Sequence, residues 1–267
     1  MFSLPLLKQT IKENSRIWFV FGAILTICSV AVIGLYHPEK GTRLASAATG
    51  VPFKWMTALG MSEHTDTLTG VLAVYLYGFL LLIGPLIYEI IVANRLMAKQ
   101  VASGTMMYLL ATPNPRRRIG NTQACFLSVS LLALFLYIAM FNLICCSLWF
   151  PGKLVVSQFV LLNLGIVCLH SCISGFCFLI SCVCDETKTF LMLGAGIPVL
   201  FYLLQLLANL GGNFRFLKYA TIFTLFSPGE IVTGSVHTYW HMLVLVLIGG
   251  SCYLAGLRMF GKRDLPF

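Results

Sequence analysis

The feature that most constrains this chain is a series of six long apolar runs that contain no charged side chain. They cover residues 17–36, 67–88, 119–152, 154–184, 189–214 and 231–257. A helix needs about 20 predominantly apolar residues to cross the hydrocarbon core of a bilayer, and each run is long enough. Within lipid, only helices and closed barrels satisfy all their backbone hydrogen bonds. The runs lack the alternating pattern of barrel strands, so the sequence predicts an all-α membrane protein.

Only 10% of the 267 residues are charged, against about 25% in ordinary soluble domains. We predict one transmembrane domain over 1–267, with spans at about 17–36, 67–94, 117–148, 155–183, 189–210 and 236–259. An amphipathic segment, 4–16, precedes the first span and is predicted to form a helix along the membrane interface. All ten cysteines fall within apolar runs, which favours packing residues over disulfides.

The distribution of basic residues predicts the orientation. Six spans place both termini on one side, and 12 of the 18 lysines and arginines would then lie on that side. Because basic residues are enriched in cytoplasmic loops, we expect a multi-pass cell-membrane protein with both termini in the cytoplasm. The net charge of +9 follows from this bias and from attraction to anionic lipid. It is therefore no argument for binding nucleic acid.

The loop between the second and third spans, 95–116, contains an apolar segment of its own. Gly104 is suited to end the preceding helix, because glycine readily takes the left-handed conformation found after helix ends. Ser103 or Thr105 could cap a second, shorter helix. That helix has room for about two turns before Pro113, which cannot continue it.

The residues of this short helix, Met106 to Leu110, are nearly all apolar. One interpretation is a helix that rests on the membrane surface. The other is a helix that docks into a groove on a soluble partner, where methionine adapts its shape to the contact. Arg116, Arg117 and Arg118 would either anchor the third span at the interface or pair with acidic groups of that partner.

The stretch ANRLMAKQVASGTMMYLLATPNPRRRIGNTQ resembles the loop between the second and third spans of ABC-2 type permeases, the membrane subunits of ATP-binding-cassette transporters. The matching features, in order, are Gly104-Thr105, Leu109-Leu110, Thr112-Pro113 and the arginines at 116–118. The six spans, the N-terminal segment and FLKYATIFTLFSPGEIVTG before the last span are also similar. The C-terminal GKRDLPF resembles the ending of such permeases from Gram-positive bacteria.

The resemblance implies a coupling helix that docks onto a separate cytosolic ATP-binding subunit. The residues it implicates are Gly104, Thr105, Met106, Met107, Tyr108, Leu109, Leu110, Thr112, Pro113, Arg116 and Arg117. It also implies a bacterial cell membrane, a second permease subunit, identical or related, and export as the direction of transport. It further suggests re-entrant helices within 214–234, where the residues alone are equally consistent with an ordinary loop.

The chain contains no G-x-x-x-x-G-K-[ST] loop to wrap phosphates. We therefore expect ATP and Mg²⁺ to be bound and used by the partner subunit, with no cofactor and no enzymatic activity on this chain. His237 and His241 stand four residues apart but lack the paired spacing of a structural zinc site, so no metal site is predicted.

Polar side chains within the spans are candidates for a substrate path or for contacts between helices. The four selected are Glu89, Asn142, His170 and Gln205. His170, in the middle of the fourth span, either bonds a hydroxyl or amide on another helix or lines a path. Glu89, at the inner end of the second span, either reaches water or pairs with Arg95, or else takes part in coupling.

Two proline sites interrupt the predicted spans. Gly84-Pro85 lies in the second span, and Gly196 with Pro198 lies in the fifth, and each predicts a kink. Kinked helices act as hinges in some proteins and are static in others. The sequence leaves the hinge role open.

The function predicted is export of a hydrophobic or amphipathic compound, such as a peptide or drug-like molecule, because an apolar path with few charges suits such cargo. The alternative is a non-transporting membrane sensor or scaffold coupled to the same ATPase. An intramembrane hydrolase is weaker, because the spans contain neither H-E-x-x-H nor G-x-S-x-G.

Overall fold

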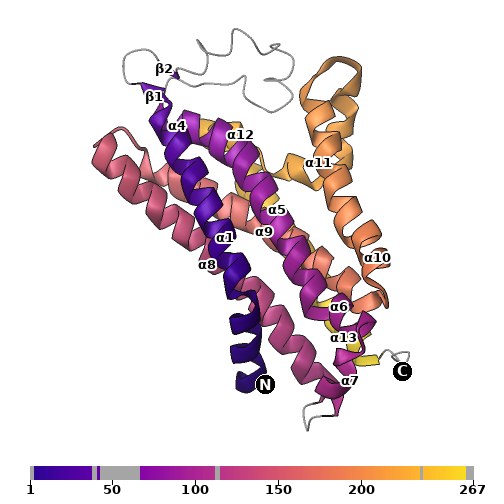
Figure 1. Ribbon diagram of the computed structural model, residues 1–267. Helices are drawn as coiled ribbons and strands as arrows, with labels where there is room; N and C mark the ends of the chain where they lie inside the picture. Colours follow the sequence, from indigo (N-terminus) through magenta and orange to yellow (C-terminus); the bar gives the residue numbers. More distant parts are fainter. Residues whose placement is uncertain (1–2, 38–40, 43–66, 112–114, 235–236, 263–267) are drawn as a thin grey trace.

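The computed structural model describes residues 3–37, 41–42, 67–111, 115–234 and 237–262, which form a helical bundle (Figure 1). Six helices are long and apolar enough to cross a membrane. They are α1 (Leu4–Gly34), Leu68–Ala102, α8 (Arg116–Trp149), α9 (Val156–Val183), Thr187–Asn209 and α13 (His237–Lys262). The strands in the described part are one antiparallel pair of two residues each, β1 (Tyr36–His37) and β2 (Gly41–Thr42). The chain is an all-α, multi-pass membrane protein, as predicted.

The bundle has two distinct ends. At one end lie the start of α1, the end of α13 and a short helix, α7 (Thr105–Leu110), and we call it the terminal end (Figure 1). Side chains of Leu257 and Phe260 in α13 lie close to Gly120 near the start of α8 there. At the other end lie β1 and the first turn of the second span, and we call it the loop end (Figure 1).

Helix α1 is a single element of 31 residues. The separate interfacial helix predicted at 4–16 is not present, because no glycine or proline between residues 6 and 21 interrupts the helix. At about 1.5 Å per residue, α1 is about 46 Å long, which exceeds a hydrocarbon core of about 30 Å. The Ser3 backbone N–H donates to Thr122 Oγ1 at 3.0 Å, and Trp18 Nε1 donates to the Ser130 carbonyl at 3.1 Å, which hold α1 along α8.

The second span alternates between α-helical and π-helical turns. Its parts are α4 (Leu68–Val71), η2 (Leu72–Leu80), α5 (Leu81–Ala93), η3 (Asn94–Ala98) and α6 (Lys99–Ala102). The π-helical segments were not predicted, and such turns are frequent at functional sites and at bends. Pro85 lies inside α5. A Cβ on the neighbouring Gly84 would lie 2.8 Å from Leu25 Cδ2, so glycine permits the close approach of α1.

Helices α9 and α13 pack with their backbones in direct contact. A Cβ on Gly175 would lie 2.6 Å from the Gly249 carbonyl oxygen, and a Cβ on Gly249 would lie 2.7 Å from the Ser171 carbonyl oxygen. Small residues allow this approach in membranes, where van der Waals packing drives helix association. The Tyr253 hydroxyl donates to Ser174 Oγ at 2.9 Å and adds a polar contact to the same interface.

The fifth span consists of α10 (Thr187–Phe190), the π-helical η4 (Leu191–Ala195) and α11 (Gly196–Asn209). The π-helix gives way to α-helix at Gly196, two residues before Pro198, where the sequence predicted a kink. Helix α11 stands at the side of the bundle, and a far smaller share of this span is buried than of the second (Figure 1).

The segment before the last span folds back onto the bundle. It forms two 3₁₀ helices, η5 (Gly212–Ala220) and η6 (Ile222–Leu225), and a short helix, α12 (Pro228–Thr233). Helix α12 packs against η2 and α9, and Gln158 Nε2 donates to the Val232 carbonyl at 2.8 Å. Phe223 and Phe226 are buried. The later part of the segment, η6 and α12, therefore packs on the bundle, whereas η5 exposes Phe216 and Tyr219.

Candidate functional site

The short helix α7 follows directly on α6 at the terminal end (Figure 1). Gly104 separates the two with a φ of +73°, the left-handed conformation predicted for this helix stop. No side chain caps α7, so the prediction that Ser103 or Thr105 does so is wrong. Instead, the two hydroxyl oxygens lie 2.7 Å apart, and Thr105 Oγ1 donates to the Gln100 carbonyl at 3.2 Å. These hydroxyls therefore stabilise the end of α6.

The two adjacent methionines of α7 have opposite environments. Met106 is fully buried, whereas the Met107 side chain is 50% exposed and the Tyr108 side chain 79% exposed. Leu109 is half-buried and packs against the core. Met106 therefore anchors α7 and is not free to contact a partner, which corrects its place in the predicted docking surface. Met107 and Tyr108 are the residues that α7 presents outward.

The structure describes only some of the remaining residues of the predicted docking surface. Thr112 and Pro113 lie outside the described residues, as does the side chain of Leu110. Helix α8 begins at Arg116, which is half-buried, and Arg117 is exposed.

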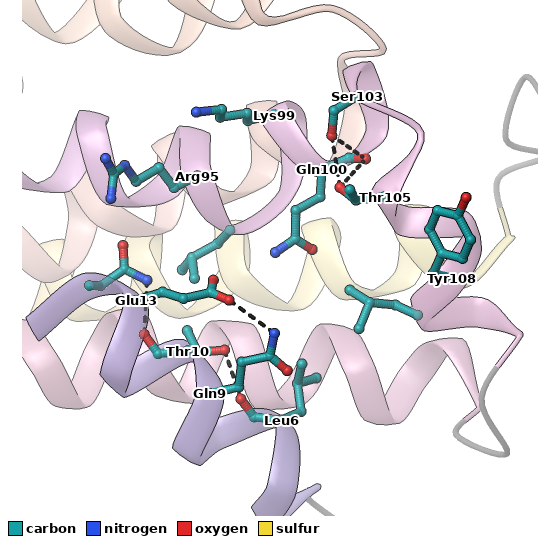
Figure 2. A pocket seen from close by; sticks show the side chains of 13 residues that line it. Leu6, Gln9, Thr10, Glu13, Arg95, Lys99, Gln100, Ser103, Thr105 and Tyr108 are labelled. Carbon is teal, nitrogen blue, oxygen red and sulfur yellow. Dashed lines mark hydrogen bonds between the residues drawn. The ribbon is translucent and has the colours of Figure 1, made fainter.

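A cavity of about 650 Å³ lies between α7 and the first turns of α1, and we call it the α1–α7 groove. The residues that line it are Leu6, Gln9, Thr10, Glu13, Asn14, Arg95, Leu96, Lys99, Gln100, Ser103, Thr105, Tyr108 and Leu109. Figure 2 shows Gln100 reaching from α6 toward Gln9 and Glu13 of α1, with Tyr108 at one end of the groove. Gln9 Nε2 donates to Glu13 Oε1 at 2.9 Å. The groove therefore lies between the predicted coupling loop and the N-terminal segment, and both contribute to its walls.

Two hydrogen-bond acceptors beside the groove find no partner among the described residues. Asn14 Nδ2 donates to the Thr10 carbonyl at 3.0 Å, but the buried Asn14 Oδ1 has no partner among the described residues. The same holds for Gln100 Oε1. A buried polar group without a partner costs roughly 1–3 kcal/mol. Arg95 and Lys99 add positive charge to the opposite wall. The groove thus offers the cations of Arg95 and Lys99 to a group from outside the chain, while the two unpaired acceptors lie beneath its surface.

A second polar site lies deep in the bundle, where Glu89 of α5 meets His170 of α9. Glu89 Oε1 lies 2.6 Å from His170 Nδ1, and neither side chain has any exposed surface. The prediction that Glu89 reaches water or pairs with Arg95 is wrong, because α9 supplies a partner on the buried face of α5. His170 was expected to bond a hydroxyl or amide and bonds a carboxylate instead. The Phe135 ring of α8 lies against the imidazole, with ring centroids 5.2 Å apart.

The other nitrogen of His170, Nε2, supplies a hydrogen bond that is missing from the backbone of α5. His170 Nε2 lies 2.9 Å from the Leu81 carbonyl oxygen. In an α-helix that carbonyl would accept from the residue four positions later, but this residue is Pro85, which has no N–H. The histidine therefore satisfies a carbonyl that proline leaves without its helical donor. The sequence signal was a proline four residues after Leu81, which became informative only once the position of α9 was known.

Asn142 and Gln205 have different surroundings. Asn142 is fully buried in α8, and neither atom of its amide finds a hydrogen-bond partner in the described part of the chain. Gln205 Oε1 accepts from Thr221 Oγ1 at 2.7 Å and from Thr224 Oγ1 at 2.8 Å. Gln205 lines a cavity of about 250 Å³ between η2, α11 and the short helices of the loop end. Gln205 thus lines a cavity, whereas Glu89 and His170 meet each other.

Among the described residues, no three His, Cys, Asp or Glu side chains gather as a metal site would require. All ten cysteines are free thiols. No protein-family model and no curated protein matches the sequence.

Proposed function

We propose that the chain is a permease subunit of an ABC-2 type transporter, which exports a hydrophobic or amphipathic compound with ATP hydrolysed by a separate subunit. The observation that carries the proposal is the form of α7. It is a separate short helix at the end of the bundle, anchored by the buried Met106, with Met107 and Tyr108 exposed beside a polar groove. The exposed Met107 and Tyr108 leave α7 able to contact a second protein.

The surroundings of α7 suit docking onto a soluble protein. Exposed aromatic and methionine side chains are enriched at protein interfaces, where they fill pockets and adapt their shape. Exposed Arg117 and the Arg95 and Lys99 wall of the groove supply the positive charge that attracts acidic groups. We place the terminal end in the cytoplasm, because most of the basic residues lie there. The resemblance to ABC-2 type permeases implies a bacterial cell.

The sequence indicates which subunit binds ATP and which carries the cargo. The chain has no phosphate-binding loop, so ATP and Mg²⁺ belong to the docked subunit. We assign the cargo to a path formed with a second permease subunit, identical or related. The half-exposed apolar face of α11 and the adjacent loop-end cavity with Gln205 support a path on that side of the bundle.

The test is purification of the complex through a tag on this chain, followed by measurement of bound ATPase activity. Tyr108→Asp places a charge on the exposed tip of α7 and should abolish recovery of the ATPase. Tyr219→Asp is the matched control, because Tyr219 is 94% exposed in η5, far from α7 in the sequence. Loss with Tyr108→Asp alone supports docking through α7. Equal recovery of ATPase from both variants would exclude α7 as the coupling helix.

Transport is distinguished from scaffolding in the same preparation. In a transporter, a hydrophobic or amphipathic cargo should change the rate of ATP hydrolysis and should move across a sealed vesicle when ATP is supplied. An ATPase that binds through α7 but responds to no cargo, and drives no movement of cargo across the vesicle, would favour the sensor or scaffold instead.

A further inference from the structure

The geometry around Glu89 and His170 fixes the number of protons that the pair holds. His170 Nε2 faces the Leu81 carbonyl oxygen at 2.9 Å, and a carbonyl only accepts, so Nε2 carries a hydrogen. His170 Nδ1 then faces Glu89 Oε1 at 2.6 Å, where two lone pairs would repel each other. One proton must lie between them, bonded to either Nδ1 or Oε1. In both cases the net charge of the pair is zero.

Gaining or losing a proton would leave an uncompensated charge in the bundle. Loss of the shared proton leaves a carboxylate beside a neutral imidazole. A second proton would have to bind Glu89 Oε2, which is buried and has no hydrogen-bond partner among the described residues. An unpaired charge inside a membrane protein is strongly unfavourable. The packed pair therefore holds one proton over a wide range of pH.

The groups packed around the pair do not alter this count. The membrane-spanning parts of α1 and α8 contain no charged residue, and neither does η4. The nearest basic residue along the second span, Arg95, lines the α1–α7 groove instead. The titratable groups within electrostatic range of the Glu89 carboxylate are Cys172 and Cys177 of α9, Tyr253 of α13 and Tyr88 of α5. Thiols and phenols are ordinarily neutral at physiological pH.

We propose that Glu89 and His170 form a proton-binding site, which holds one proton while α5 and α9 are packed and releases it to water when they separate. In water, a glutamic acid ionises near about pH 4.3 and an imidazolium loses its proton near about pH 6.5. Above pH 6.5 the packed pair holds one proton and the separated pair holds none. The equilibrium constant for separation then rises about tenfold per pH unit. Between the two values both states hold one proton, and separation is independent of pH.

The site makes helix separation sensitive to pH at the point where α5 is weakest. Pro85 has already removed one helical hydrogen bond, and the bond from His170 that replaces it is lost in the same event. Separation therefore exposes a carboxylate, an imidazole and a backbone carbonyl to water together. The proposal concerns this chain alone and holds whether or not an ATPase docks at α7.

The test measures how fast N-ethylmaleimide reacts with the buried thiols of Cys172 and Cys177 in the full chain, held in phosphatidylcholine nanodiscs. Both thiols are at most 2% exposed, so the maleimide reaches them only when the packing around α9 opens. The reference is the Glu89→Gln variant, whose amide can donate to His170 Nδ1 without any shared proton. Its separation releases no proton above about pH 6.5 and takes one up below that value.

The quantity compared is the wild-type rate divided by the Glu89→Gln rate at the same pH, so that the pH dependence of the thiol chemistry cancels. It should rise about tenfold per pH unit from about pH 5.5 to 7.5. The same ratio at Cys125, a half-buried thiol of α8, should stay constant. A constant ratio at Cys172 and Cys177 would overturn the proposal.

If Glu89→Gln cannot be purified folded, the wild type provides the test by itself. The rate at Cys172 relative to that at Cys125 should be flat below about pH 6.5 and should rise about tenfold per unit above it. A flat profile throughout, or a rise toward low pH, would show that the pair does not hold the proton described.

Discussion

The Glu89–His170 pair and the α1–α7 groove are both polar sites in an apolar molecule, but their hydrogen-bond partners come from different places. In the pair, both imidazole nitrogens and one carboxylate oxygen are satisfied within the chain, and neither side chain is exposed. In the groove, the buried Asn14 Oδ1 and Gln100 Oε1 find no partner among the described residues. The polar atoms of the pair are therefore nearly all satisfied within the chain, whereas two polar atoms beside the groove are not.

The largest effect expected from this comparison is that of Glu89→Ala. Removing the Glu89 carboxylate leaves the buried His170 Nδ1 without a hydrogen-bond partner, which costs about 1–3 kcal/mol, and opens a cavity, for which truncation of a comparable buried side chain costs about 2–5 kcal/mol more. The free energy of unfolding should fall by about the sum of these two costs. Glu89→Gln keeps a donor for His170 Nδ1 and should lose far less. Reversible denaturation in detergent measures both variants, and an equal loss in the two would mean that packing, not the hydrogen bond, determines stability here.

A smaller effect is expected within α7, where two adjacent methionines give a matched pair. Met106 is buried, and truncating a buried methionine costs about 2–5 kcal/mol, so Met106→Ala should lower the free energy of unfolding. Met107 is 50% exposed, and Met107→Ala should change stability by less than about 0.5 kcal/mol. The same denaturation assay compares them. Similar losses from both variants would place Met107 in the core and remove it from the docking surface.

The packing of α9 on α13, which holds Tyr253 and Cys172 beside the pair, provides the next test. Gly249→Ala forces a methyl group to within 2.7 Å of the Ser171 carbonyl oxygen, and such overpacking costs about 1–3 kcal/mol. A methyl group on the neighbouring Gly250 would meet no atom of another element within 4 Å, so Gly250→Ala should be neutral or slightly stabilising. Reversible denaturation in detergent measures the free energy of unfolding of both variants. A neutral Gly249→Ala would mean that the two helices slide apart at little cost.

The sequence predicted the elements better than it predicted their contacts. Six spans followed from charge-free length, and the stop at Gly104 followed from the need for a left-handed residue. The Glu89–His170 contact did not follow, because the two residues are 81 positions apart and their meeting depends on how α5 packs against α9. Local patterns set local structure, whereas pairing across helices is a property of the assembled bundle.

The errors in α1 and α7 have the same origin. Lysines on one face of 4–16 suggested an interfacial helix, but nothing in the backbone ends that helix before the span, so it runs on to Gly34. Apolar character suggested that all of Met106 to Leu110 would face a partner. Burial depends on which face of so short a helix meets the bundle, and composition does not specify that face. The role of α1 in the groove was missed for the same reason.

The smallest effect on stability, and the most direct test of the comparison, is expected from Asn14→Leu. This change removes an acceptor that has no partner among the described residues and replaces it with an apolar side chain of similar size, so the free energy of unfolding should change by less than about 1 kcal/mol. Recovery of the ATPase should nevertheless fall, because a partner that docks in the groove would have to uncover Asn14 Oδ1 and would then satisfy it.

The control for Asn14→Leu is Asn163→Leu. Asn163 Nδ2 donates to the Phe159 carbonyl four residues earlier at 2.8 Å, as Asn14 Nδ2 donates to the Thr10 carbonyl, but Asn163 lies in α9, away from the groove. Only Asn14→Leu should weaken docking. If Asn14→Leu instead destabilises the chain as strongly as Glu89→Ala, then Asn14 Oδ1 has a partner within the folded protein, and the groove is a closed structural site like the pair.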